Sequence, residues 1–209
     1  LDSDDACTDD ALETFLSEWN KIPVEKQSGY YGVSCRTCDE NGVIYGTPMN
    51  APYIDSCDLE LKFKFKITGE LWGMIRTDVM REFPFPVVEG YHFYPESIIW
   101  NTVGRKYKSR YINKALRYYI NDQENAVTNV NRKNASKEKF PMHLHYINDC
   151  WDYRKYNRKR YLEHIVAITR DGMANSYTPK EIRRLVKPGI RRFLVALFCP
   201  VGIFLYKRS

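Results

Sequence analysis

The sequence predicts an α/β protein with a mixed, Rossmann-like sheet in its first part and a helical extension after it. Apolar runs and alternating patterns that are typical of strands recur between residues 29 and 120. Amphipathic segments with helical spacing lie between them. From residue 141 onward the apolar residues keep helical spacing, with basic residues between them. We therefore expect one domain over residues 1–129 and a basic helical extension over residues 130–209.

The first predicted element is a one-sided helix that follows an acidic start. Thr8 is a suitable N-cap residue, and the two aspartates after it suit the positive end of a helix dipole. The apolar residues then follow at i, i+3, i+4 and i+7: Leu12, Phe15, Leu16 and Trp19. The pattern predicts that the helix ends near residues 20–22.

Strand patterns follow this helix. Residues 29–36 predict a strand, residues 39–42 a turn, and residues 43–45 the returning strand of a hairpin. Residues 46–55 contain two prolines and predict a loop. Residues 59–67 alternate apolar with charged side chains, which predicts a strand with one charged face.

Further elements complete the first domain. Residues 71–75 predict a short buried strand and residues 78–82 a short helix. Pro95 suits the first turn of another helix, whose apolar stripe ends near residue 107. Residues 111–120 predict a strand, and the polar, Asn-rich residues 123–139 predict a loop at the domain boundary.

The end of the sequence is an apolar run between two basic pairs. Residues 193–206 are almost wholly apolar, and two cationic residues stand on each side. These 14 residues are fewer than the ~20 that span a bilayer. The run therefore predicts either an anchor in a membrane interface or a segment docked on the core.

Charge is distributed unevenly along the chain, although the formal net charge is only +6. Residues 1–60 hold 13 acidic against 3 basic residues, and residues 151–209 hold 4 against 14. An acidic region suits a cation, and a basic region suits the phosphates of lipid or nucleic acid. Two solvated faces of opposite sign would explain the same distribution.

The six cysteines and the paired histidines predict no metal site. Cys35 and Cys38 form a CxxC pair without a second ligand pair at the spacing of structural zinc sites. We therefore expect reduced thiols. His143 and His145 have no carboxylate or cysteine close by in the sequence, which favours structural roles.

The aspartates at the start are the first candidates for chemistry. Asp2 and Asp4 stand at i and i+2, so two carboxylates at a strand end would share one hard cation. The alternative is an acidic cluster that only precedes the helix. An EF-hand loop starting at Asp2 fails, because Cys7 occupies the glycine position. A phosphatase of the haloacid dehalogenase type remains open, although Ala6 replaces its Thr or Val.

Three segments resemble family 2 glycosyltransferases, which have an A-type fold and use nucleotide-sugar donors. Residues 1–12 are similar to the metal motif of the family and its following helix. Residues 69–77 are similar to its mid-domain strand and the next helix start. Residues 93–97 (FYPES) are similar to its Glu-Asp motif, although Ser97 replaces the usual Asp. The resemblance covers residues 1–129 and implies that the nucleotide-binding half would precede them.

The resemblance implies inverting sugar transfer assisted by Mn²⁺ or Mg²⁺. Asp4 and Asp2 would bind the metal, and Asp2 and Asp5 would contact the donor. Either Glu96 or Glu89 would be the catalytic base that deprotonates the acceptor hydroxyl. Without the nucleotide-binding half, these 209 residues alone are expected not to catalyse sugar transfer.

Trp72 and His92 are the candidates for acceptor contacts, and the acceptor would be a saccharide or lipid-linked molecule. The family context implies surface polysaccharide synthesis at the cytoplasmic face of a membrane, as a peripheral protein. The alternative function is a non-enzymatic basic module, since basic residues interleave with tyrosines over residues 153–161. An anionic membrane is the partner we expect for it, rather than nucleic acid.

Overall fold

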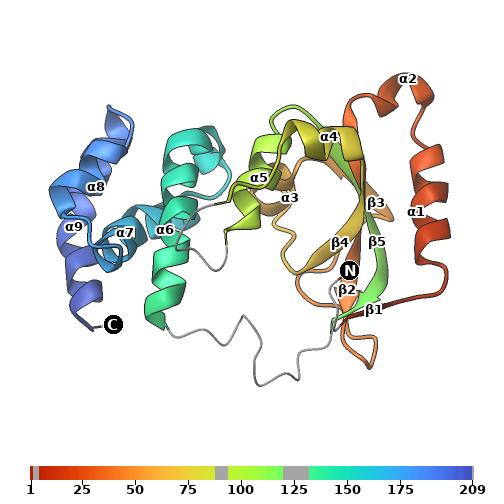
Figure 1. Cartoon of the computed structure of the whole chain (residues 1–209), viewed down its shortest axis with the longest axis horizontal. Helices are drawn as coiled ribbons and strands as arrows, with labels where there is room; N and C mark the ends of the chain where they lie inside the picture. The colour runs from red at the N-terminus through yellow and green to blue at the C-terminus, as the bar shows by residue number, and fades with distance from the viewer. Residues whose placement is uncertain (2–4, 88–93, 120–131, 209) are drawn as a thin grey trace. The chain divides into compact units, whose positions relative to one another are not determined.

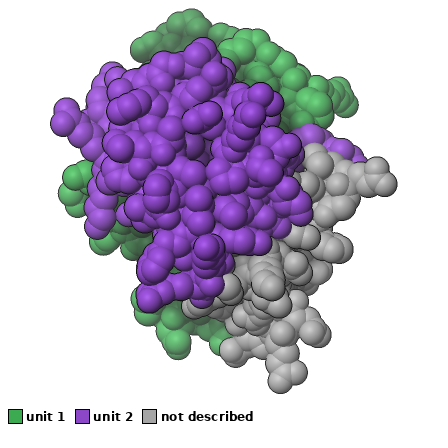
Figure 2. Space-filling view, turned by 90° about the vertical axis from the view of Figure 1, so that its left-hand side faces the viewer, with its two compact units in different colours: residues 1–84, 99–126 green, residues 85–98, 127–209 purple. Residues whose placement is uncertain are grey.

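The computed structural model describes residues 1, 5–87, 94–119 and 132–208, and only the backbone of residues 132–138. The chain divides into two compact units, coloured separately in Figure 2. The first unit comprises Leu1–Pro84 and Ile99–Ala126, and the second comprises Phe85–Ile98 and Val127–Ser209.

The first unit is built on a mixed sheet. Its described strands are β1 (Ala6–Cys7), β2 (Tyr30–Cys38), β3 (Tyr53–Ser56), β4 (Leu71–Ile75) and β5 (Lys108–Tyr118). The order is β1-β5-β2-β4, and β3 also pairs with β5. Strands β2 and β5 are parallel, whereas the other pairs are antiparallel. The predicted mixed α/β class is therefore confirmed.

Helices cover both faces of this sheet (Figure 1). The described helices up to residue 103 are α1 (Ala11–Asn20), α2 (Val24–Gln27), α3 (Asp58–Phe63), α4 (Thr77–Glu82) and α5 (Glu96–Val103). Phe15 of α1 packs into one apolar cluster with Val33, and Trp72 joins this cluster. Leu61 of α3 packs into a second cluster, which the adjacent Leu71 joins. Successive β4 residues thus pack on opposite faces of the sheet, as expected for a pleated strand.

The strand predicted over residues 59–67 is wrong, because α3 occupies much of this stretch. Leu59 and Phe63 are buried at i and i+4 on one helical face, and Leu61 between them is buried too. A helix this short, covered on two sides, produces the same alternating pattern as a strand. The chain leaves this region through Lys66, whose φ is 58°.

Two shorter predictions also need correction. The return of the hairpin at residues 43–45 is a single bridge between Cys38 and Ile44. The turn before it is held by Asp39, whose Oδ1 accepts a hydrogen bond from the Val43 amide at 2.8 Å. Residues 46–55 are not wholly a loop, because β3 begins at Tyr53 and pairs with β5.

The second unit contains the C-terminal helices. They are α6 (Arg132–Asp149), the 3₁₀ helix η2 (Trp151–Lys155), α7 (Arg158–Ala174), α8 (Pro179–Leu185) and α9 (Ile190–Arg208). The loop predicted over residues 123–139 is wrong from Arg132 onward, where α6 begins. That stretch lacks apolar periodicity, but its Lys, Ala and Glu residues are good helix formers.

Local capping fixes where the last helices start. The Asn157 side chain accepts a hydrogen bond from the Arg160 amide at the start of α7. Thr178 and Glu181 form a reciprocal capping box at the start of α8, with Pro179 in its first turn. Of the helices that the structure describes, none has the length and apolar character needed to cross a bilayer.

Candidate functional site

Asp5, the last residue of the acidic start, is bound to Arg117 near the C-terminal end of β5. Asp5 Oδ2 accepts a hydrogen bond from Arg117 Nε at 2.6 Å and a second, shorter one from Nη2. Both side chains are buried, with 2% and 6% of their surfaces exposed. Glu70 Oε1 lies 3.7 Å from Arg117 Nη1. This ion pair therefore fixes the backbone that directly follows Asp4 against β5.

Several predicted site residues lie outside the described part of the chain. These are Asp2 and Asp4, the expected metal ligands, together with Glu89 and His92. Among the residues that the structure does describe, no group of three or more His, Cys, Asp or Glu side chains could hold a metal. The metal site at residues 2–5 stays a prediction.

Glu96 is the first residue of α5, and its side chain is exposed. The helix start predicted at Pro95 is thus correct, and a carboxylate stands in its first turn. Asp5 belongs to the first compact unit and Glu96 to the second. The role of Glu96 as a base stays a prediction.

Trp72 lies on β4, in register with Cys35 of β2. Its indole is partly buried and meets the ring of Phe15 edge to face, with 5.2 Å between the ring centroids. Such aromatic pairs stabilise a core by about 1 kcal/mol beyond the area that they bury. This placement gives Trp72 a packing role, and a contact with an acceptor stays a prediction.

A buried arginine is the polar feature that the sequence did not reveal. Arg36 of β2 is 0% exposed, and its Nη2 donates a hydrogen bond to the Tyr45 carbonyl at 2.7 Å. Its Nε and Nη1 have no hydrogen-bond partner in the described structure. Burial lowers the pKa of this guanidinium. Removal from water with so few partners is costly for a charged group.

The second unit buries a network of titratable groups between α6 and α7. His143 Nδ1 lies 2.7 Å from His164 Nδ1, and His143 Nε2 lies 2.9 Å from Asp171 Oδ2. Arg170 Nε donates to Asp171 Oδ1 at 2.5 Å. Burial raises the pKa of Asp171, but its contacts with His143 and Arg170 outweigh this, and the pKa is lowered overall.

His145 also has polar partners, and both lie within five residues of it in the sequence. Its Nε2 lies 3.3 Å from Cys150 Sγ, and its Nδ1 lies 3.3 Å from Asp149 Oδ2. His143 and His145 thus both have an acidic partner, contrary to the absence expected from the sequence. The i+4 partner of His145, Asp149, could have been found from helical spacing. The contacts of His143 join α6 to α7, whereas those of His145 stay within α6 and the residue that follows it.

We compared the chain with protein-family models, with curated proteins and with solved structures, and found no match in any of the three.

Proposed function

We propose that this chain carries the metal-binding and acceptor-side part of an inverting glycosyltransferase with an A-type fold. The single observation that carries the proposal is the buried pair of Asp5 with Arg117. The pair holds Asp5, the residue directly after the two proposed metal ligands, against Arg117 near the end of β5. The mixed sheet and the start of α5 at Glu96 agree with the order of elements that the resemblance implies.

The donor groups of the acidic segment suit a hard divalent cation. Asp5 is engaged by Arg117, so Asp2 and Asp4 are the carboxylates that would hold Mn²⁺ or Mg²⁺. When bound, the cation would neutralise the charge that develops on the leaving diphosphate of a nucleotide sugar. Asp5 then acts as a positioning residue, and we assign the donor contact to Asp2.

Glu96 is our choice as the catalytic base, and Glu89 is the alternative. An exposed carboxylate in the first turn of a helix is accessible to an incoming hydroxyl. It would remove the proton from the acceptor hydroxyl while the oxygen attacks the anomeric carbon. The acceptor would be a saccharide or a lipid-linked molecule in surface polysaccharide synthesis.

The experiment measures release of nucleoside diphosphate by the complete gene product. A panel of nucleotide sugars is offered with Mn²⁺ or Mg²⁺, and with a chelator instead. We expect turnover that needs the metal and is abolished in Asp4→Ala, while the matched variant Asp9→Ala keeps it. Full activity of Asp4→Ala, or turnover in the presence of the chelator, would refute the proposal.

The second candidate is a basic module without enzymatic activity. It is favoured by the cationic, partly apolar surface of α8 and α9, which carries Arg183, Arg184 and exposed Phe193. A module of this kind would bind polyanions in a salt-dependent manner and would be indifferent to Asp4→Ala and Glu96→Gln. Loss of nucleotide-sugar turnover in those variants would exclude it as the sole function.

A further inference from the structure

Helix α9 uses one of its faces to pack on α7. Val195 and Gly202 are buried on this face. Gly202 lies so close to α7 that an added Cβ would stand 2.5 Å from Thr169 Cβ and 2.8 Å from the Val166 carbonyl oxygen. The glycine therefore permits close contact between the two helices. One side of the predicted apolar run is thus docked on the protein. Docking on the core was one of the two alternatives predicted for this run.

The opposite face of α9 is apolar and exposed. Five of its side chains are each between 46% and 60% exposed: Ile190, Phe193, Leu197, Val201 and Phe204. Their spacings of three and four residues place them on a single stripe of the helix. We call these five residues the apolar stripe. A contiguous exposed apolar patch of this kind typically marks an interaction surface.

Cations stand at both ends of the apolar stripe. Arg183 and Arg184 of α8 line a pocket of about 440 Å³ beside its N-terminal end, together with Phe193. Lys207 and Arg208 close its C-terminal end, and α9 contains no acidic residue. The surface is therefore both apolar and strongly basic.

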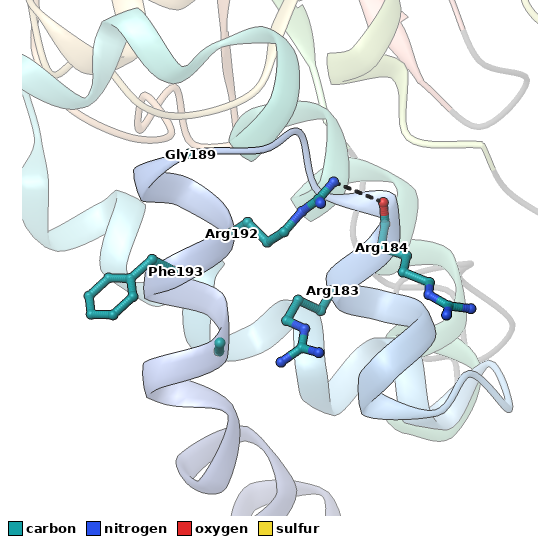
Figure 3. Close-up of a pocket in the computed structure, with 6 residues that line it drawn as sticks. Arg183, Arg184, Gly189, Arg192 and Phe193 are labelled. Atoms are coloured by element: carbon teal, nitrogen blue, oxygen red, sulfur yellow. Dashed lines mark hydrogen bonds between the residues drawn. The ribbon is translucent and has the colours of Figure 1, made fainter.

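The arginines around this pocket have different roles (Figure 3). Arg192 is held by the protein, because its Nε donates to the Val186 carbonyl at 2.8 Å and its Nη2 to the Arg184 carbonyl at 3.4 Å. Arg183 and Arg184 make no ion pair within 4.0 Å of any side chain that the structure describes, although Arg184 interacts at longer range with the Glu181 carboxylate. Their guanidinium groups remain available for an external anion.

We propose that the apolar stripe docks on an anionic lipid bilayer, with Arg183 and Arg184 binding lipid phosphates. The three aliphatic side chains of the stripe have no counterpart in a nucleic-acid backbone, whereas both its aliphatic and its aromatic side chains enter the acyl boundary of a bilayer. Pairing two copies through the same stripe would bring their cationic ends together, which opposes a dimer. The proposal is independent of sugar transfer, because no residue of the proposed metal or base site takes part.

The test is flotation of the 209-residue chain with vesicles, at 50 and 500 mM salt. One vesicle type is phosphatidylcholine with 30% phosphatidylglycerol, and the other is phosphatidylcholine alone. We expect binding to the anionic vesicles that weakens about tenfold or more at high salt. The double variant Phe193→Ser with Leu197→Ser should lose about tenfold or more in affinity, since both side chains would enter the bilayer.

Two matched controls distinguish binding through this surface from non-specific binding to vesicles. Leu12 and Leu16 of α1 are 68% and 53% exposed, so Leu12→Ser with Leu16→Ser removes equally exposed apolar side chains elsewhere. Arg183→Glu with Arg184→Glu is compared with Arg158→Glu and Lys159→Glu, which makes the same change in net charge. Only the variants of the α8–α9 surface should lose vesicle binding.

Three results would overturn the proposal. The first is equal binding of wild type and the Phe193/Leu197 variant to anionic vesicles, with the variant confirmed folded by circular dichroism. The second is an equal loss in the control variants. The third is evidence for another partner, either tighter binding to a DNA duplex than to vesicles or a dimer in sedimentation that Leu197→Asp dissociates.

Discussion

The carboxylate of Asp5 and the guanidinium of Arg117, 112 positions apart in the sequence, form a buried ion pair at the end of β5. The pair joins the start of the chain to the last strand of the sheet. Two charges removed from water depend on each other, so the loss of one leaves the other uncompensated. This relationship makes Asp5 part of the fold of the first unit.

Breaking this pair should destabilise the first unit strongly. We expect Asp5→Ala and Arg117→Met each to lower the free energy of unfolding by about 3 kcal/mol. The double variant should be more stable than either single variant, because no buried charge is left over. Urea unfolding monitored by tryptophan fluorescence measures this. Asp78→Ala, which breaks the exposed pair with Arg76, should change little; equal losses would contradict the account.

Arg36→Met should leave the protein as stable as before or stabilise it by about 1 kcal/mol. The substitution removes a buried guanidinium with two unpartnered nitrogens and keeps an apolar side chain of similar length. Arg110→Met is the matched control, since Arg110 is also buried but is paired with Asp55 through two bonds of 2.8 Å. It should lose stability. The account is contradicted if Arg36→Met is the more damaging of the two.

Asp171 should contribute to the loss of stability in acid. Its pKa is lowered in the folded chain, whereas an unfolded Asp titrates near about 3.9. The stabilisation is therefore present above that pH and is lost as the pH falls through the lower folded pKa. Asp171→Asn should reduce the loss of stability, measured by urea unfolding, as the pH falls below about 4. Arg170→Met keeps the His143 contact and should give an intermediate curve; an unchanged loss of stability in both would contradict this.

The two faces of α9 should respond oppositely to substitution. Gly202→Leu forces a side chain against Thr169 and the Val166 carbonyl, so we expect a loss of about 1–3 kcal/mol. Leu197→Ser changes an exposed position and should stay within about 0.5 kcal/mol of wild type. Thermal unfolding compares the two variants. A large loss in Leu197→Ser would mean that the apolar stripe is covered by the protein itself.

The sequence was sufficient where structure depends on local pattern. Helix α1 and strands β2, β4 and β5 lie within about three residues of their predicted bounds, because their periodicity spans most of each element. The cap predicted at Thr8 is wrong, since α1 begins after Asp10. The predicted stripe of α1 was only partly right, since Phe15 is buried whereas Leu12 and Leu16 are exposed. Spacing alone places residues on a helical face but does not show how wide a face the sheet covers.

Features that depend on distant residues could not be predicted. No local pattern links Asp5 to Arg117, or His143 to Asp171, because tertiary packing alone brings these side chains together. The two guanidinium nitrogens of Arg36 that have no partner could not be predicted for the same reason. The candidate site was predicted from resemblance, and the structure adds the anchor at Asp5 to it.

The most direct test of the central claim is Mn²⁺ binding by the 209-residue chain, followed by electron paramagnetic resonance of the free ion. We predict one Mn²⁺ site, weakened about tenfold or more in Asp4→Asn and in folded Arg117→Met, and unchanged in Asp9→Asn. Equal Mn²⁺ affinity in wild type and Asp4→Asn would contradict the account that the acidic segment before the Asp5–Arg117 pair is a metal site.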